Sequence, residues 1–190
     1  MSESELIDEL LEDAKGRMAK SVDSTKTEFG TVRTGRASPA LLDRVNVDYY
    51  GTSTPLKQLA NISASEARLL TVTPYDKTSI KAIEKSIMES DLGLTPSNDG
   101  AVIRLSIPEL TEERRKDMVR IIRGIAEDGR VAVRNVRRDI MHDLRELKKE
   151  GDVGGDDEHR AEEALQKLTD ERTHEIDELL KHKEQEILEV

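Results

Sequence analysis

Eight basic side chains between positions 116 and 145 have the types and the spacing to bind a polyanion. In a helix, which turns by about 100° per residue, all of them would lie within an arc of roughly 100°. All but one are arginines, whose planar guanidinium groups hold phosphate through paired hydrogen bonds and stack on bases. We refer to this set as the basic stripe: Lys116, Arg120, Arg123, Arg130, Arg134, Arg137, Arg138 and Arg145.

The acidic residues of the same segment lie mostly outside the basic stripe. Residues 114–149 hold 12 basic and 6 acidic side chains, in a chain with a formal net charge of −10. Glu127 projects into the stripe, whereas other acids project to one side of it, at Asp117, Asp128, Asp139 and Glu146. A face that served solubility alone would mix the two signs. Two interpretations stay open at this point: a solvated face with salt bridges between successive turns, and a face that binds a polyanion.

The composition narrows the choice of polyanion and excludes several kinds of active site. Aromatic residues make up 2% of the chain, so the stacking platforms that read single-stranded RNA are missing and a folded RNA surface fits better. Without cysteine there is no disulfide, no zinc–thiolate site and no cysteine nucleophile. The histidines lack metal-ligand spacing, and no phosphate-binding loop or nucleophile-elbow motif occurs. We therefore expect no enzyme, no metal and no cofactor; a hydrolase acting through a buried pair of carboxylates is the enzymatic alternative.

A long helix must carry the basic stripe, and the sequence predicts it over residues 111–149. Apolar residues three or four positions apart predict two more long helices, one over residues 4–32 and one that follows a glycine-rich turn at 151–155. Helices that each bury one apolar side are not stable alone in water, so we expect an elongated antiparallel three-helix bundle. The predicted N-caps are Ser4, Thr111 and either Asp156 or Asp157.

The residues between the first two helices predict a different kind of structure. Alternating apolar residues predict short strands, and a helical period predicts one short helix over residues 77–89. Residues 50–55 have the composition of a turn. The strands are expected at residues 45–49, 69–73 and 101–107. Together these elements make a small β/α/β domain.

The predicted fold is α+β, with two domains. The β/α/β domain covers residues 34–108 and is inserted into a bundle made of residues 1–33 and 109–190. The linkers at 34–39 and 106–108 would act as hinges. No apolar run approaches the roughly 20 residues of a membrane span, and the acidic N-terminus does not have the pattern of a targeting peptide. We expect a cytoplasmic protein with no membrane partner.

A series of motifs in order along the chain resembles the ribosome recycling factor family over essentially the whole sequence. The motifs are Arg33–Pro39, Tyr49–Thr52, Ser90–Leu94, Thr111–Lys116 and Val131–Asp139. The resemblance implies an L-shaped molecule of about transfer-RNA dimensions, built from the bundle and the inserted domain. It also implies a monomer that binds the large subunit of the post-termination ribosome through ribosomal RNA. With elongation factor G and GTP hydrolysis, such a protein would split the subunits and release mRNA and tRNA.

The resemblance also assigns roles to individual residues. The principal RNA contact of the family maps to Arg137, and Arg134 and Arg138 belong to the same motif. We extend the expected RNA-binding face along the basic stripe to Arg130, Arg123, Arg120 and Lys116, and add Arg115 from the motif at residues 111–116. The hinge positions are Thr34, Gly35, Arg36, Ala37, Ser38, Pro39, Ser106, Ile107 and Pro108.

Two other functions stay open beside this one. A helical scaffold or chaperone would need no RNA-binding face and would not sediment with ribosomes at low salt. A protein that only stalls or protects ribosomes would use the same docking face as a recycling factor, so the sequence does not separate the two.

Overall fold

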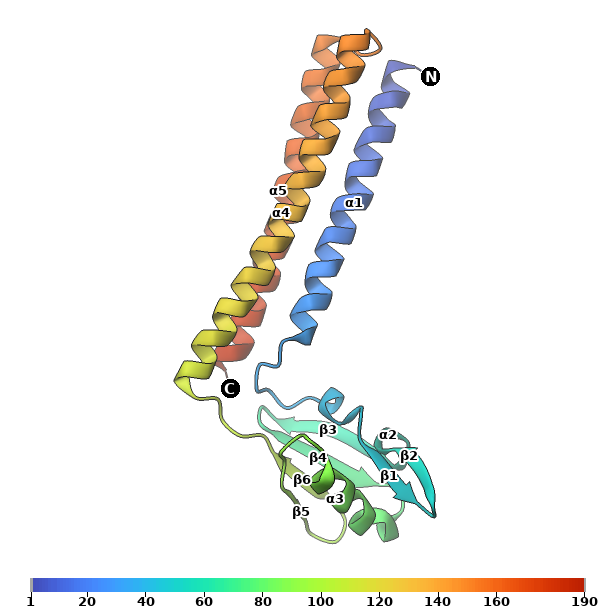
Figure 1. Cartoon of the computed structure of the whole chain (residues 1–190), viewed down its shortest axis with the longest axis vertical. Helices are drawn as coiled ribbons and strands as arrows, with labels where there is room; N and C mark the ends of the chain where they lie inside the picture. The colour runs from blue at the N-terminus through green and yellow to red at the C-terminus, as the bar shows by residue number, and fades with distance from the viewer. Residues whose placement is uncertain (1, 190) are drawn as a thin grey trace. The chain divides into compact units, whose positions relative to one another are not determined.

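The computed structural model describes residues 2–189, which divide into two compact units. One unit comprises the residues up to Arg33 together with Lys116–Gln185, and it holds most of three long helices. The other comprises Thr34–Arg115 and the residues from Glu186 onward, and it holds two antiparallel sheets. The predicted fold class, a helical bundle with an inserted α+β domain, is confirmed (Figure 1).

Three long helices form the bundle: α1 (Glu3–Thr31), α4 (Glu112–Glu150) and α5 (Gly155–Leu188). Arg123, early in α4, pairs with Glu184, late in α5, and Arg130, about two turns further along α4, pairs with Asp177. The partner's number falls as the arginine's number rises, so α4 and α5 are antiparallel. Each helix buries the side that its apolar residues predict, with Met18, Ile122 and Leu165 almost completely inaccessible to solvent.

Gly129 allows α1 and α4 to approach closely near the middle of the bundle. A Cβ atom at Gly129 would lie 2.2 Å from Thr25 Oγ1 and 3.2 Å from Ile176 Cδ1, so no side chain fits without displacement. Thr25 is buried, and its hydroxyl donates a hydrogen bond to the Ser21 carbonyl at 2.9 Å. Residues of all three helices therefore meet at this one point of the core.

The structure corrects two of the three predicted helix caps. The N-cap of α1 is Ser2 and not Ser4, because Ser2 and Glu5 exchange hydrogen bonds in a capping box. Helix α5 already begins at Gly155, so Asp156 and Asp157 lie in its first turn, where their charge favours the positive end of the helix. The prediction for α4 is confirmed, since the Thr111 hydroxyl accepts a hydrogen bond from the Arg114 amide at 3.1 Å.

The second unit is built on an antiparallel sheet of four strands in the order β3-β4-β6-β5. These strands are β3 (Ala60–Glu66), β4 (Leu69–Pro74), β5 (Pro96–Asn98) and β6 (Ile103–Ser106). A separate hairpin pairs β1 (Asn46–Tyr49) with β2 (Thr52–Pro55), and the helices are α2 (Leu56–Leu59) and α3 (Ile80–Glu89). Short 3₁₀ turns occur at Pro39–Leu42 and Lys77–Ser79. The core of this unit joins Ile83 and Ile87 of α3 to sheet residues such as Leu70, Val72 and Leu105.

The predicted strands correspond to β1, β4 and β6, whereas β2, β3 and β5 were not predicted. Strands β3 and β5 are the two edges of the four-stranded sheet, and most of their side chains are exposed. Edge strands need few apolar residues, so β3 reads as a polar segment with Ile62 alone among large aliphatic side chains. Strand β2 lies inside the segment 50–55 predicted as a turn; only Tyr50 and Gly51 form the turn itself, both at positive φ.

Within residues 2–189, no helix has the length and apolar composition required to cross a membrane.

Candidate nucleic-acid interface

Helix α4 positions the basic stripe opposite its buried side. Its core-facing residues, among them Ile122, Val133 and Ile140, are almost completely buried. The side chains of the stripe are exposed or half-buried, and they lie on one continuous helix between positions 116 and 145. Stripe residues three or four positions apart lie about 5–6 Å from one another, and the two steps of seven residues, from Arg123 to Arg130 and from Arg138 to Arg145, each span about two turns. The predicted stripe therefore lies along a single face of one helix.

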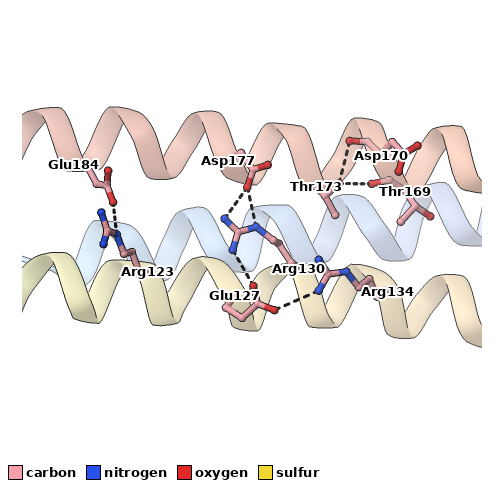
Figure 2. A network of polar contacts seen from close by, with 9 residues as sticks. All are labelled: Arg123, Glu127, Arg130, Arg134, Thr169, Asp170, Thr173, Asp177 and Glu184. Carbon is pink, nitrogen blue, oxygen red and sulfur yellow. Dashed lines mark hydrogen bonds and ion pairs between the residues drawn. The ribbon is translucent and has the colours of Figure 1, made fainter.

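Arg130 is held from both sides by carboxylates (Figure 2). Its Nε and Nη2 atoms contact Asp177 Oδ1 of α5 at 2.8 Å and 2.7 Å, and its Nη1 donates to Glu127 Oε2 at 2.9 Å. Its side chain is 20% exposed. Burial lowers the pKa of Arg130, but the hydrogen bonds to Asp177 and Glu127 outweigh burial and leave that pKa raised. Arg130 thus joins α4 to α5, and while Glu127 is in place it has little of its guanidinium group left for a ligand.

Glu127 bridges Arg130 and Arg134. Its second oxygen, Oε1, accepts a hydrogen bond from Arg134 Nη1 at 3.3 Å. The hydrogen bond from Arg130 is the main cause that holds the pKa of Glu127 below its ordinary value; partial burial opposes it and Arg134 reinforces it. Arg134 itself is 50% exposed, so its outer face remains open to solvent.

Arg137 differs from Arg130 in the kind of group that it contacts. Its Nη1 donates to the neutral amide oxygen of Gln166 on α5 at 2.6 Å, and Gln166 in turn donates to Asp170 at 2.8 Å. The Nε atom of Arg137 is buried and has no hydrogen-bond partner among residues 2–189. The charge of Arg137 is therefore oriented by α5 without being neutralised by a carboxylate.

The remaining stripe residues vary in how far they are paired. Arg123 donates to Glu184 at 2.8 Å, and Arg120, whose side chain is 81% exposed, lies 3.6 Å from Asp117. Within the part of the chain that the structure describes, the exposed side chains of Arg138 and Arg145 make no ion pair and no side-chain hydrogen bond. The positive charge available to a ligand is consequently greatest toward the C-terminal half of α4, from Arg134 to Arg145.

The structure does not bring Arg115 into the basic stripe. Its side chain is 29% exposed and its Nη2 atom lies 3.7 Å from Glu109 Oε1, in the segment before α4. Glu109 also lies 3.6 Å from Arg68, in the turn between β3 and β4. Lys116, one residue further along α4, is exposed and belongs to the stripe.

The residues that map to the hinges are partly held in place. The amides of Ala37 and Ile107 donate to the carbonyls of Ala67 and Arg68, at 2.7 Å and 2.8 Å. Gly35 has a φ of +77°, and a Cβ atom there would lie 2.8 Å from a Leu110 carbon atom, so this position requires glycine. The other hinge positions have varied surroundings: Thr34 is buried, Ser38 and Pro39 begin a 3₁₀ turn, Ser106 ends β6, and Arg36 and Pro108 are exposed.

Sequence reasoning missed the side chains of α5 that orient the stripe. Gln166, Asp177 and Glu184 lie opposite Arg137, Arg130 and Arg123. Their spacing of 7 and 11 residues is a helical period, which is the signal that they share a face. The pairing itself depends on the register of α4 against α5, and the sequence does not specify that register.

Residues 2–189 contain no group of three or more His, Cys, Asp or Glu side chains that could hold a metal ion. Within the same range, Glu158 is the single acidic residue that is buried, and it pairs with Lys148. The arrangement as a whole is a surface of oriented cations, suited to binding phosphate groups.

Comparisons with known proteins show which family the chain belongs to. The family model described as "Ribosome recycling factor" matches residues 25–188. Ribosome-recycling factors of Rubrobacter xylanophilus and Shouchella clausii are 56% and 57% identical to the chain, over 98% and 96% of it and 100% and 98% of their own lengths.

Two solved structures are also similar to this chain. A solution structure of a ribosome recycling factor has a TM-score of 0.70 and 42% identity, covering 97% of this chain and 98% of that one. A second comes from models of the T. thermophilus ribosome recycling factor and the E. coli elongation factor G bound to the E. coli post-termination complex. It has a TM-score of 0.63 and 46% identity, covering 99% of this chain and 100% of that one. The chain belongs to the ribosome recycling factor family.

Proposed function

We propose that this protein binds the large subunit of the post-termination ribosome through the basic stripe of α4. Together with elongation factor G and GTP hydrolysis, it then promotes the splitting of the subunits and the release of mRNA and tRNA. The observation that carries this proposal is the charge of Arg137, which Gln166 orients without neutralising it. The similar structure of a recycling factor and elongation factor G on a post-termination complex supports the choice of partners.

The stripe would act through phosphate contacts. Arginines that are fixed on one rigid helix lose little freedom when they meet an RNA surface of matching shape. Each phosphate that they neutralise releases condensed counterions, so binding should weaken steeply with salt. The acidic residues of α5 and of the segments outside residues 114–149 would repel RNA that does not match the stripe.

The protein would have no catalytic step of its own, because the hydrolysis of GTP belongs to elongation factor G. We expect it to act as a monomer in the cytoplasm, where ribosomes terminate translation. The hinge segments at 34–39 and 106–108 would allow the second unit to move while the bundle stays docked.

Co-sedimentation with purified ribosomes tests the docking step. The wild-type protein should pellet with ribosomes at about 50 mM salt and be released by about 200 mM. Arg137→Ala should pellet much less, whereas Arg160→Ala, which removes an exposed arginine from α5, should behave as wild type. Failure of the wild type to pellet at low salt would favour the helical-scaffold alternative.

A further inference from the structure

Glu127 is the acidic residue of α4 that lies within the basic stripe, and its carboxylate contacts two of the stripe's arginines. Each of its two carboxylate oxygens accepts a hydrogen bond from a different arginine: Oε2 from Arg130 at 2.9 Å and Oε1 from Arg134 at 3.3 Å. Figure 2 shows the carboxylate lying between the two guanidinium groups. Two arginines that share one anion through separate oxygens form the arrangement in which phosphate is held in proteins.

The geometry allows Glu127 to leave without disturbing the helices. Its side chain is 54% exposed and comes from the outer side of α4, so a change of rotamer would carry the carboxylate into solvent. Arg130 would keep its position, because its Nε and Nη2 atoms remain on Asp177 of α5. Its Nη1 atom and Arg134 Nη1 would then be free to hold another anion.

We propose that Glu127 is an internal stand-in for an RNA phosphate, which fills the site between Arg130 and Arg134 in the free protein and is displaced by a phosphate on the ribosome. This inference rests on the proposed function and adds to it an internal anion that competes with the RNA. Displacing Glu127 weakens the binding of every polyanion by the same factor. An RNA surface that also contacts Arg137, Arg138 and Arg145 overcomes that factor, whereas an unstructured RNA that contacts a few arginines does not.

The variant Glu127→Gln tests the proposal, because glutamine keeps the size of the side chain and removes its charge. Binding would be measured by fluorescence anisotropy against two probes, purified ribosomes and poly(U), over a series of salt concentrations. We expect Glu127→Gln to bind both probes about 3- to 10-fold more tightly than wild type, which corresponds to the loss of two exposed ion pairs. The gain should be similar for the two probes, because each of them displaces the same internal anion, and poly(U) should therefore stay bound at a higher salt concentration than it does with the wild type.

Asp128→Asn is the matched control. Asp128 is the next residue of α4, it is exposed, and it makes no ion pair or side-chain hydrogen bond within residues 2–189. The substitution changes the net charge by the same amount and leaves the carboxylate between the arginines in place. We expect its binding to change less than twofold.

A second variant tests whether the gain in binding depends on Arg134. In a background of Arg134→Ala, the site between the two guanidinium groups is lost, so Glu127→Gln should give little further gain. Circular dichroism and thermal melting of each variant would show that the bundle is intact.

Three results would overturn the proposal: no gain in Glu127→Gln, weaker binding in that variant, or an equal gain in Asp128→Asn. Weaker binding would mean that Glu127 positions Arg134 for the ligand, and an equal gain would mean a general effect of charge. The poly(U) measurement does not depend on ribosomes. If the wild type failed to bind ribosomes, the proposed function would fall while poly(U) still tested Glu127.

Discussion

Arg130 and Arg137 lie two turns apart on the same helix, and their surroundings give them different tasks. Arg130 is fixed between Asp177 and Glu127, so its loss would leave Asp177 without its ion-pair partner and Glu127 with Arg134 alone. Among residues 2–189, the side chain of Arg137 hydrogen-bonds only to the neutral Gln166, so its loss would remove a charge from the surface and no ion pair. At the residue scale, Arg130 links α4 to α5 through Asp177, whereas Arg137 is the arginine that we propose as the principal contact with RNA.

Arg137→Ala should weaken ribosome binding by roughly tenfold or more, the equivalent of one hydrogen-bonded charge contact. The helical content and the melting temperature should stay close to those of the wild type. Equilibrium binding and circular dichroism on the same preparation would check both statements. Wild-type affinity in this variant would refute the assignment of Arg137.

Arg130→Ala should lower the stability of the bundle, whereas Arg137→Ala should lower ribosome binding. Removing a partly buried guanidinium group from two carboxylates should lower the free energy of unfolding by about 1–2 kcal/mol. Urea denaturation measures this loss, and Arg138→Ala serves as the control, because Arg138 is exposed and makes no ion pair within residues 2–189. Equal stability of the two variants would mean that the link between α4 and α5 contributes nothing.

At the element scale, the long helices could be predicted and the edges of the sheet could not. The apolar period of α4 located the stripe, because helical geometry alone decides which residues share a face. Strand β3 escaped prediction because an edge strand with an exposed face has no apolar alternation to detect. The partners Gln166 and Asp177 depend on the register of two helices, which is set by the packing of the whole core.

Replacing each of two glycines of α4 by alanine should have opposite effects on stability, because one glycine packs against a neighbouring helix and the other does not. Gly129→Ala would place a Cβ atom 2.2 Å from Thr25 Oγ1, and relieving that contact should cost about 1–3 kcal/mol of stability. Gly124 has no atom within 4 Å of its would-be Cβ, so Gly124→Ala should stabilise the helix by about 0.5–1 kcal/mol. Thermal melting of the two variants measures the difference. A second substitution, Thr25→Ala, should recover part of the loss at Gly129.

The turn between β5 and β6 predicts a pH dependence. Asp99 accepts hydrogen bonds from Arg104 and from the amides of Val102 and Ala101, and these contacts, that of Arg104 first, lower its pKa to about 2. A carboxylate whose pKa is lowered by folding stabilises the folded state at pH values above its ordinary pKa of 3.8. This stabilisation is lost as the pH falls toward 2.

Asp99→Asn should therefore melt at a lower temperature than wild type near neutral pH. The difference should shrink as the pH falls from about 4 to about 2. Thermal melting over that pH range measures it. A difference that stays constant with pH would mean that the charge of Asp99 does not contribute to stability.

At the scale of the whole molecule, one basic segment is set in an acidic chain. Residues 114–149 carry 12 basic and 6 acidic side chains, while the chain as a whole has a formal net charge of −10. Such a distribution directs a polyanion to one surface and keeps it from the rest. The same distribution could be read from the sequence, whereas the neutralisation of Arg123 and Arg130 by α5 became visible only in the structure.

The salt dependence of ribosome binding should show how many arginines contact a phosphate group. If Arg134, Arg137, Arg138 and Arg145 each neutralise one, the logarithm of the binding constant should fall with the logarithm of salt at a slope of about −3. Arg137→Ala should reduce that slope by about one unit. An affinity that does not change with salt would contradict docking through phosphates.

The splitting of ribosomes is the most direct measure of the central claim. Light scattering would be followed after post-termination ribosomes are mixed with this protein, elongation factor G and GTP. We predict a fall in scattering that requires all the components, that is much slower with Arg137→Ala, and that is unchanged with Arg160→Ala. Splitting that proceeds normally with Arg137→Ala, or no splitting with the wild-type protein, would contradict the account.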